Sequence, residues 1–165
     1  MASELRKKTF DPFKILLRIP VPWVYVLTYL VGTLLQVILP FSVFPLNSIM
    51  TVKITGIMLF STGAIFAAWS LLIFHRARTT TTPGESSKKL VMNGPYRFTR
   101  NPMYVSLIFA YIGEAGILTQ IWPILVLPLI LAYVDRVVIP LEEKVLKQDF
   151  AEEYEDYCAR VHRWL

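Results

Sequence analysis

The chain has 165 residues, of which 55% are hydrophobic and 18% are charged, and its net charge is +5. This balance departs from the soluble average toward a membrane protein, and the length predicts a single domain over residues 1–165. One cysteine excludes an internal disulfide, and two distant histidines offer no metal-ligand spacing, so no metal site is expected. The cations flank apolar runs instead of alternating with aromatic residues, which indicates membrane topology and not nucleic-acid binding.

The first half of the chain predicts two membrane-spanning helices. Residues 1–18 are basic and predict a lead-in that lies on the membrane surface. About 20 apolar residues cross a bilayer, so spanning helices are expected over 22–39 and 54–74, with a proline-rich turn between them. Small residues let transmembrane helices pack closely. The small residues of the second helix are Gly56, Gly63, Ala64, Ala67 and Ala68.

The second half begins with a polar loop over 75–102, and loops of that length are usually functional or disordered. The next apolar run is interrupted by Glu114 and is expected to form a hairpin of two helices, 103–117 and 121–139. One long helix is the alternative. Residues 140–165 predict an amphipathic helical tail that lies on the membrane or packs over the loop.

The positions of the cations decide the predicted topology. All but Lys53 of the 17 lysines and arginines fall within residues 1–18, 76–100 and 136–163. Four spanning helices place these three zones on one side, and the positive-inside rule makes it the cytosolic side. The sequence therefore predicts an all-α, polytopic membrane protein with about four transmembrane helices and with both termini in the cytosol.

Residues 90–104, LVMNGPYRFTRNPMY, combine turn formers, cations and aromatic rings at the predicted cytosolic mouth of the third helix. The paired acids Glu142 and Glu143 are expected on the same membrane face. Carboxylates can accept hydrogen bonds from a ribose diol, an aromatic face can attract a sulfonium, and an arginine can bind a carboxylate through two hydrogen bonds. The set suits a zwitterionic, nucleoside-like cofactor.

These residues also have structural explanations. Arg97 and Arg100 could only anchor a helix end, and the tyrosines Tyr96 and Tyr104 could belong to an interfacial aromatic belt. One glutamate of the pair could be an ordinary acid near a helix N-terminus. Function is favoured for Arg100 and Tyr104, whereas Asp135 and Arg136 most simply mark the end of the fourth helix.

Residues 90–104 resemble the LV-x-x-G-x-Y…R-H-P-x-Y signature of the isoprenylcysteine carboxyl methyltransferase and phospholipid methyltransferase family of integral membrane methyltransferases. The tail resembles the E-E-x-x-L…F-G-x-x-Y-x-x-Y-x-x-x-V-P-R ending of the same family. The tail residues that carry this second match are Glu142, Glu143, Leu146, Phe150, Tyr154, Tyr157, Val161 and Arg163. Together the matches cover about residues 75–165.

The resemblance implies transfer of a methyl group from S-adenosylmethionine to a lipid-borne or hydrophobic acceptor. The cofactor would enter from the cytosol and the acceptor from the bilayer. Arg100 and Tyr104 would be the catalytic residues, with Arg100 steadying the acceptor or the cofactor carboxylate. The implied cofactor-binding residues are Val91, Gly94, Tyr96, Asn101, Tyr104, Glu142 and Glu143, and which glutamate contacts the cofactor stays open.

The chain departs from the family pattern at four positions. Asn101 stands where the best-known members have histidine, and asparagine can donate and accept hydrogen bonds but cannot act as a base. Ser106 and Ala151 replace glycines and His162 replaces a proline. These three changes are expected to affect packing more than chemistry.

The acceptor and two alternative functions stay open at this level. A carboxylate needs no base, whereas an amine must lose a proton before it is methylated. Because the sequence shows no dedicated base, an isoprenylcysteine-like carboxylate is favoured over an amine. The alternatives are a membrane-bound NADPH-dependent reductase, which the missing G-x-G-x-x-G motif disfavours, and a non-catalytic membrane scaffold.

Overall fold

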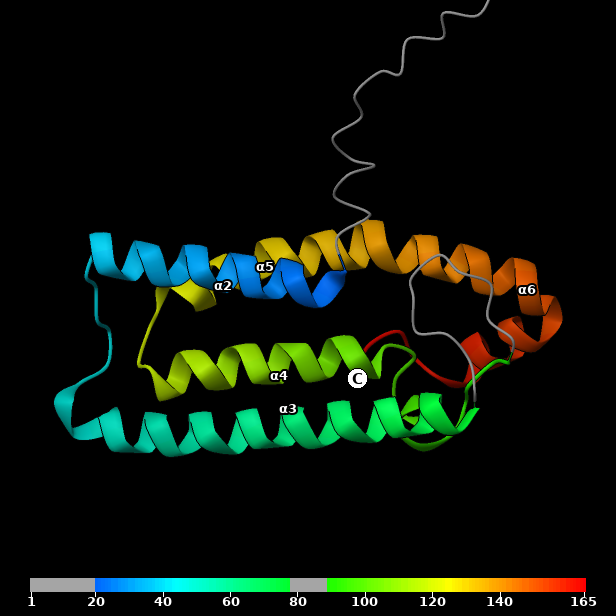
Figure 1. Cartoon of the computed structure of the whole chain (residues 1–165), viewed down its shortest axis with the longest axis horizontal. Coiled ribbons are helices and arrows are strands. Elements are labelled where there is room, and N and C mark those ends of the chain that lie inside the picture. Colours follow the sequence, from blue (N-terminus) through cyan, green and yellow to red (C-terminus); the bar gives the residue numbers. More distant parts are fainter. Residues whose placement is uncertain (1–19, 78–88) are drawn as a thin grey trace, which may run out of the picture.

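The computed structural model describes residues 20–77 and 89–165, which form an elongated bundle of helices (Figure 1). The basic lead-in predicted for residues 1–18 and the middle of the polar loop lie outside these residues. The described residues contain no β-strand, which confirms the all-α prediction. The elements are α2 (Val21–Ile38), the 3-10 turn η1 (Leu46–Ser48), α3 (Ile49–Ala77), the 3-10 turn η2 (Gly94–Arg97), α4 (Pro102–Ile117), α5 (Trp122–Tyr133), the π-helical segment η3 (Val134–Val138) and α6 (Ile139–Arg160).

Four apolar helices build the bundle. The segments Val21–Ile38, Leu46–Ala77 and Trp122–Arg160 are each long and apolar enough to cross a membrane, and α4 is a shorter apolar helix. In Figure 1 the beginnings of α2 and α4 and the ends of α3 and α5 lie at the same end of the bundle. This is the helix arrangement of an integral membrane protein in which residues 102–138 form a hairpin and not one long helix.

Glycines allow α3 and α4 to touch through their backbones. A Cβ atom on Gly113 would lie 2.4 Å from the Phe60 nitrogen and 2.7 Å from the Gly56 oxygen, and one on Gly63 would lie 2.7 Å from the Ser106 oxygen. Side chains at these positions would force the helices apart, because packed interiors leave little room. The predicted close packing of the second helix is therefore confirmed for Gly56 and Gly63, whose partner is α4 of the same chain, whereas Ala64 and Ala68 are exposed.

The predicted tail does not separate from the fourth helix, because α5, η3 and α6 form one continuous helical run (Figure 1). A proline inside a helix lacks an N–H group, and its ring clashes with the carbonyl four residues earlier. Pro140 is the second residue after the wider π-helical segment η3. That local widening explains how the helix passes the proline without a break.

The chain reverses inside α6, at Ala151. This residue has φ 40° and ψ −114°, a backbone conformation that only glycine adopts without cost. Beyond it the helix returns to the bundle, where Tyr154 and Tyr157 are buried against Leu90 in a small hydrophobic cluster. Of the two positions predicted for the tail, the structure therefore shows packing over the loop. Alanine at position 151, where the family pattern has glycine, therefore affects the backbone and not only the packing that the sequence predicts.

Candidate functional site

The predicted site residues gather at the end of the bundle where α4 begins and α6 starts. Tyr104, in the first turn of α4, is 8% exposed and donates a 2.6 Å hydrogen bond to Oε1 of Glu142. Pro102 occupies the first turn beside it, as is common because that turn needs no N–H donor from the proline. The loop and the tail, which the sequence only placed on the same membrane face, thus meet through a direct contact.

Glu143 contacts two guanidinium groups. Its carboxylate accepts two hydrogen bonds from Arg163, 2.6 Å from Nη2 and 3.1 Å from Nε, and Nη2 of Arg100 lies 3.4 Å from Oε1. The Arg100 and Glu143 side chains are 16% and 17% exposed. Glu142 and Glu143 are neighbours in sequence but face different partners, so their roles in the site differ.

The C-terminal residues hold this arrangement together. The backbone N–H of Arg100 donates to the His162 carbonyl at 2.9 Å. The Arg163 carbonyl accepts from the Thr99 hydroxyl at 2.9 Å and from Nδ2 of Asn101 at 3.0 Å. We name residues 162–164 the C-terminal strap, because they connect the loop before α4 to the start of α6. Asn101 acts here as a hydrogen-bond donor, a role that needs no imidazole.

Asp135 is a member of the site that the sequence motifs do not indicate. It lies in the π-helical segment η3 and accepts hydrogen bonds from Nε1 of Trp164 at 2.9 Å and from Nη1 of Arg163 at 3.3 Å. From the sequence alone, Asp135 and Arg136 indicate only the end of the fourth helix. The sequence feature that could have indicated Asp135 is the Arg163-Trp164 pair in the tail motif. The side-chain N–H groups of both residues need an acceptor near the membrane surface.

Other predicted cofactor residues hold the loop in place. Gly94 has φ +62° and packs so closely on α3 that a Cβ atom would lie 3.2 Å from Nε1 of Trp69. The ring of Tyr96 packs edge-on against Phe74 with centroids 5.2 Å apart, and its carbonyl accepts a 2.7 Å hydrogen bond from the Tyr157 hydroxyl. Val91 is partly buried, and Arg97 is exposed. The contacts of Gly94 and Tyr96 thus position the segment that carries Arg100.

The electrostatics of the two glutamates differ. The pKa of Glu142 is raised to about 7, because burial and, to a smaller extent, the charge of Glu143 outweigh the opposing hydrogen bond from Tyr104. Glu142 lies in α6, beyond the apolar part of the last spanning helix. The pKa of Arg163 is also raised, chiefly by its hydrogen bonds to Glu143. A carboxyl group with a pKa near 7 can exchange a proton at neutral pH, a property of a general base that the sequence did not show.

The groups present fit a zwitterionic cofactor that carries a ribose and a carboxylate. Carboxylates, an amide and guanidinium groups lie together, and Nε of Arg100 is buried without a hydrogen-bond partner among the described residues. A buried donor without a partner is costly unless a ligand or water satisfies it. An open hollow of about 380 Å³ lies beside Glu143 and is also lined by Pro140, Lys144, Lys147 and Gln148.

These features define an integral membrane helical protein with an arginine–carboxylate site at one end of the bundle. The family described as phospholipid methyltransferase matches residues 51–153, from within α3 to within α6. The chain belongs to this family, and the resemblance noted in the sequence is confirmed.

Two relatives are both named "Probable protein-S-isoprenylcysteine O-methyltransferase", from Oryza sativa subsp. indica and Oryza sativa subsp. japonica. Each is 33% identical to this chain over 81 residues, which is 49% of this chain and 42% of the relative. The chain therefore matches less than half of the length of these relatives. No solved structure matches the chain.

Proposed function

We propose that this protein transfers a methyl group from S-adenosylmethionine to a lipid-borne acceptor at the arginine–carboxylate end of the bundle. One observation carries the proposal: Arg100 and Tyr104, at the start of α4, contact Glu143 and Glu142, at the start of α6. Membership of the phospholipid methyltransferase family and the names of the two rice relatives support the same reaction class.

The residues that would hold the cofactor follow from their chemistry. Glu142 and Glu143 can accept hydrogen bonds from a ribose diol, and the unpartnered Nε of Arg100 can donate to a carboxylate. Tyr104 and Asn101 add an aromatic face and an amide, and the backbone of Val91, Gly94 and Tyr96 completes the proposed pocket. When bound, the cofactor supplies a methyl group on a cationic sulfur that a nucleophile can take by in-line displacement. The protein mainly has to align the reactants and exclude water.

We propose a carboxylate as the acceptor, as in an S-prenylated cysteine. The rice relatives are named for this substrate class. The charges of Arg100 and Arg163 are balanced by Glu143 and Asp135, so the unpartnered Nε of Arg100 is the donor that would steady a carboxylate, either that of the acceptor or that of the cofactor. A carboxylate is already a nucleophile, so no residue has to remove a proton from it.

An amine is the second candidate acceptor, and Glu142 is the observation that favours it. An ammonium group must lose a proton before it can take a methyl group. Because the pKa of Glu142 is about 7, this carboxylate can accept that proton at neutral pH. The family name includes phospholipids, some of which carry amines.

The orientation in the membrane is part of the proposal. Arg76, Arg97, Arg100 and Arg163 lie at or beyond the ends of helices on the site side of the bundle, whereas Lys53 lies near the start of α3. The positive-inside rule then places the site and both termini in the cytosol. A cofactor made in the cytosol would reach the site directly, and a lipid-borne acceptor would reach it from the bilayer.

Calorimetric titration of the detergent-solubilised protein with S-adenosylhomocysteine tests the cofactor. We expect saturable binding that the Glu142→Gln, Glu143→Gln double variant loses. Glu152→Gln is the matched control, because Glu152 is an exposed acid on the same helix. Failure of folded wild-type protein to bind would overturn the methyltransferase proposal. Binding of NADPH in a parallel titration would favour a reductase, and binding of neither compound would favour a scaffold.

A second experiment separates the two acceptors. Vesicles that contain phosphatidylethanolamine and micelles that contain an S-prenylated cysteine are each incubated with the protein and with methyl-labelled S-adenosylmethionine. Label in a methyl ester supports the carboxylate acceptor. Label on the amine, lost in Glu142→Gln but kept in Glu152→Gln, supports the amine acceptor instead.

A further inference from the structure

Asp135 is a charged residue inside the last candidate spanning segment. It follows Trp122, the first residue of α5, by 13 positions, and about 20 residues are needed to cross a bilayer. Ionisable side chains are costly at such positions, and those that occur there usually have a specific partner and a function. Asp135 also lies in the π-helical segment η3, and π-helical turns inside α-helices are frequent at functional sites. Both features indicate that Asp135 does more than end a helix.

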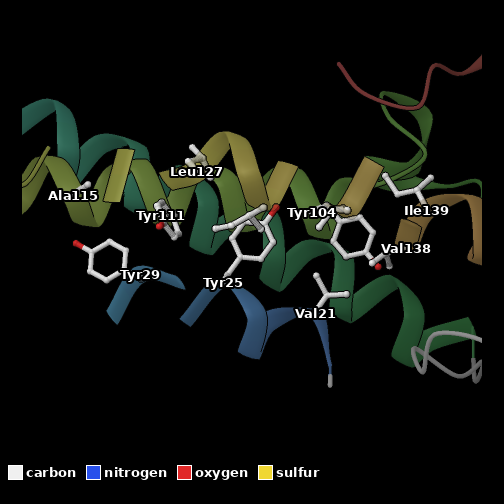
Figure 2. Packing of buried hydrophobic residues seen from close by; sticks show 11 residues of the cluster. Val21, Tyr25, Tyr29, Tyr104, Tyr111, Ala115, Leu127, Val138 and Ile139 are labelled. Atoms are coloured by element: carbon white, nitrogen blue, oxygen red, sulfur yellow. The ribbon is translucent and has the colours of Figure 1, made fainter. Parts of the chain in front are cut away.

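The backbone around Asp135 is held in place by the core. Val134, Val138 and Ile139 are 0%, 5% and 0% exposed and belong to the main hydrophobic cluster. Figure 2 shows Val138 and Ile139 beside Tyr104, which belongs to the same cluster and lies in the first turn of α4. A side chain on a rigid, packed element positions its partners more precisely than one on a loop. Asp135 therefore gives the C-terminal strap a fixed point of attachment.

A series of contacts leads from Asp135 to Arg100. Oδ1 of Asp135 accepts a 3.3 Å hydrogen bond from Nη1 of Arg163. Arg163 donates to Glu143 through Nε and Nη2, and Oε1 of Glu143 lies 3.4 Å from Nη2 of Arg100. We name these four residues the charge network. Among the described residues Asp135 forms no hydrogen bond or ion pair with Glu143 or Arg100, so its influence on Arg100 passes through Arg163.

The network ends at a donor that has no partner. Nη2 of Arg100 pairs with Glu143 and Nη1 donates to Sγ of Cys158, whereas Nε is buried and unpartnered. The first two contacts fix the plane of the guanidinium group and thereby the direction of the Nε–H bond. A carboxylate that is not held elsewhere binds arginine through two parallel hydrogen bonds. By occupying Glu143, Arg163 keeps this carboxylate from turning to Arg100 and taking Nε as well.

We infer that Asp135 is a positioning residue that acts through Arg163 and Glu143 to keep Nε of Arg100 free and oriented for a carboxylate of the cofactor or of the acceptor. This inference rests on the proposed function, which supplies the carboxylate. An effect of charge alone would have the opposite sign. Two arginines and two acids balance in the network, so removal of the Asp135 charge leaves a positive charge that favours an anion. The direction of the change in affinity thus separates positioning from charge.

Calorimetric titration tests the inference with S-adenosylhomocysteine and with its decarboxylated analogue. Asp135→Asn keeps the shape of the side chain but loses the charge-assisted hydrogen bond to Arg163. If the carboxylate is that of the cofactor, this variant should bind S-adenosylhomocysteine about tenfold more weakly and the analogue as wild type does. Arg136→Gln is the control, because it changes the charge of an exposed neighbour by one unit and should leave both affinities unaltered. Thermal unfolding shows that each variant is folded.

Methyl-transfer kinetics cover the other source of the carboxylate. If it is that of the acceptor, Asp135→Asn should bind both adenosyl ligands as wild type does, and its KM for an S-prenylcysteine should rise about tenfold. Its KM for S-adenosylmethionine should not change. In either case Arg163→Met interrupts the network. Adding Asp135→Asn to Arg163→Met should therefore cause no further loss, because residues that act through one another give non-additive effects.

Four outcomes would overturn the inference. Tighter ligand binding in Asp135→Asn would show an effect of charge, and equal losses for S-adenosylhomocysteine and its analogue would show that Asp135 only supports the fold. Unchanged affinities together with an unchanged acceptor KM would show that it does neither. Additive losses in the Arg163→Met background would show that the effect does not pass through Arg163.

A measurement without ligand separates this inference from the proposed function. If folded wild-type protein binds no S-adenosylhomocysteine, the proposed function fails, and the NMR signal of the Arg100 Nε–H group then decides whether Asp135 positions Arg100. Its chemical shift should change in Asp135→Asn and stay the same in Arg136→Gln. An identical signal in wild type and Asp135→Asn would show that Asp135 does not position Arg100.

Discussion

The hydroxyl of Tyr104 donates a 2.6 Å hydrogen bond to Glu142, although 38 positions separate the two residues. The bond joins the first turn of α4 to the first turn of α6. Tyr104 is buried, and Glu142 has a raised pKa because it too is largely removed from water. The same contact between Tyr104 and Glu142 therefore affects both the stability of this end of the bundle and the chemistry proposed for it.

Replacing Tyr104 with phenylalanine should destabilise the protein by about 1–3 kcal/mol, since it leaves the Glu142 carboxyl without its donor. Unfolding in detergent at pH 8 would measure the loss. A double-mutant cycle with Glu142→Gln isolates the contact, because residues that share a hydrogen bond give non-additive effects. Strictly additive losses would contradict the contact. The same variant should also weaken S-adenosylhomocysteine binding if Tyr104 lines the cofactor pocket.

The raised pKa of Glu142 predicts that stability depends on pH. Its usual value is 4.5 and its value in the fold is about 7, so the folded protein holds the proton more tightly than the unfolded chain does. Protonation of Glu142 therefore stabilises the fold. This contribution is complete below about pH 4.5, declines as the pH rises, and is lost above about pH 7, a change on the order of 3 kcal/mol.

Thermal unfolding between pH 5 and pH 8 measures this dependence. The wild-type protein should unfold at a lower temperature at pH 8 than at pH 5, and Glu142→Gln should reduce that difference. Glu152→Gln, an exposed change on the same helix, should leave it unaltered. Identical pH profiles for wild type and Glu142→Gln would show that another group causes the effect.

Replacing Ala151 with glycine should make the folded protein more stable. With φ 40°, its Cβ atom is strained in a conformation that costs a residue with a side chain about 1–2 kcal/mol. Ala151→Gly removes this strain and should raise the free energy of unfolding by about 1 kcal/mol, after the entropy that glycine adds to the unfolded chain. Ala159→Gly is the control, since the same change in the regular part of α6 should destabilise instead. A loss of stability in both variants would contradict the strained turn.

The fold could be predicted because apolar length and charge placement determine a membrane bundle. The predicted bounds 22–39 differ from those of α2 by one residue at each end. The predicted bounds 103–117 differ from those of α4 by one residue at the start and agree at the end. The continuous run from α5 to α6 was not predicted, because proline is usually a boundary signal and a π-helical turn has no simple sequence pattern. In the same way, α3 begins before Lys53, since a cation near a membrane surface does not prevent helix formation.

The site could be predicted as a set of residues but not as a set of contacts. The motifs indicated Arg100, Tyr104 and the glutamate pair, and these residues lie together. Their pairing depends on the helical rotation at the start of α6 and on the reversal at Ala151, which returns the C-terminal strap to the loop. Asp135 was missed for the same reason, because its partners lie 28 and 29 positions later in the chain.

The close backbone contact between α3 and α4 predicts that the protein does not tolerate a side chain at Gly113. A Cβ atom on Gly113 would lie 2.4 Å from the Phe60 nitrogen, a backbone atom that cannot move without shifting the helix. Gly113→Ala should therefore destabilise the protein by about 1–3 kcal/mol through overpacking, despite alanine's higher helix propensity. Ala64→Leu is the control, because Ala64 is an exposed residue of α3 and its change should have little effect on unfolding. Equal stability of Gly113→Ala and wild type would contradict the close helix contact.

Arg163 tests whether the C-terminal strap depends on the shape of the guanidinium group or only on its charge. Its two hydrogen bonds to Glu143 and its contact with Asp135 use the planar fork of arginine. Arg163→Lys keeps the charge but loses this fork, so it should cost about 1–2 kcal/mol, a value limited because the side chain is 31% exposed. Hydrogen exchange of the Arg100 amide, which donates to the His162 carbonyl, should quicken in the variant as the strap opens more often.

Arg160→Lys is the control, since Arg160 is exposed and its Nε donates to a backbone carbonyl one turn earlier in the same helix. Unchanged exchange at Arg100 in Arg163→Lys would show that the backbone contacts alone hold the strap.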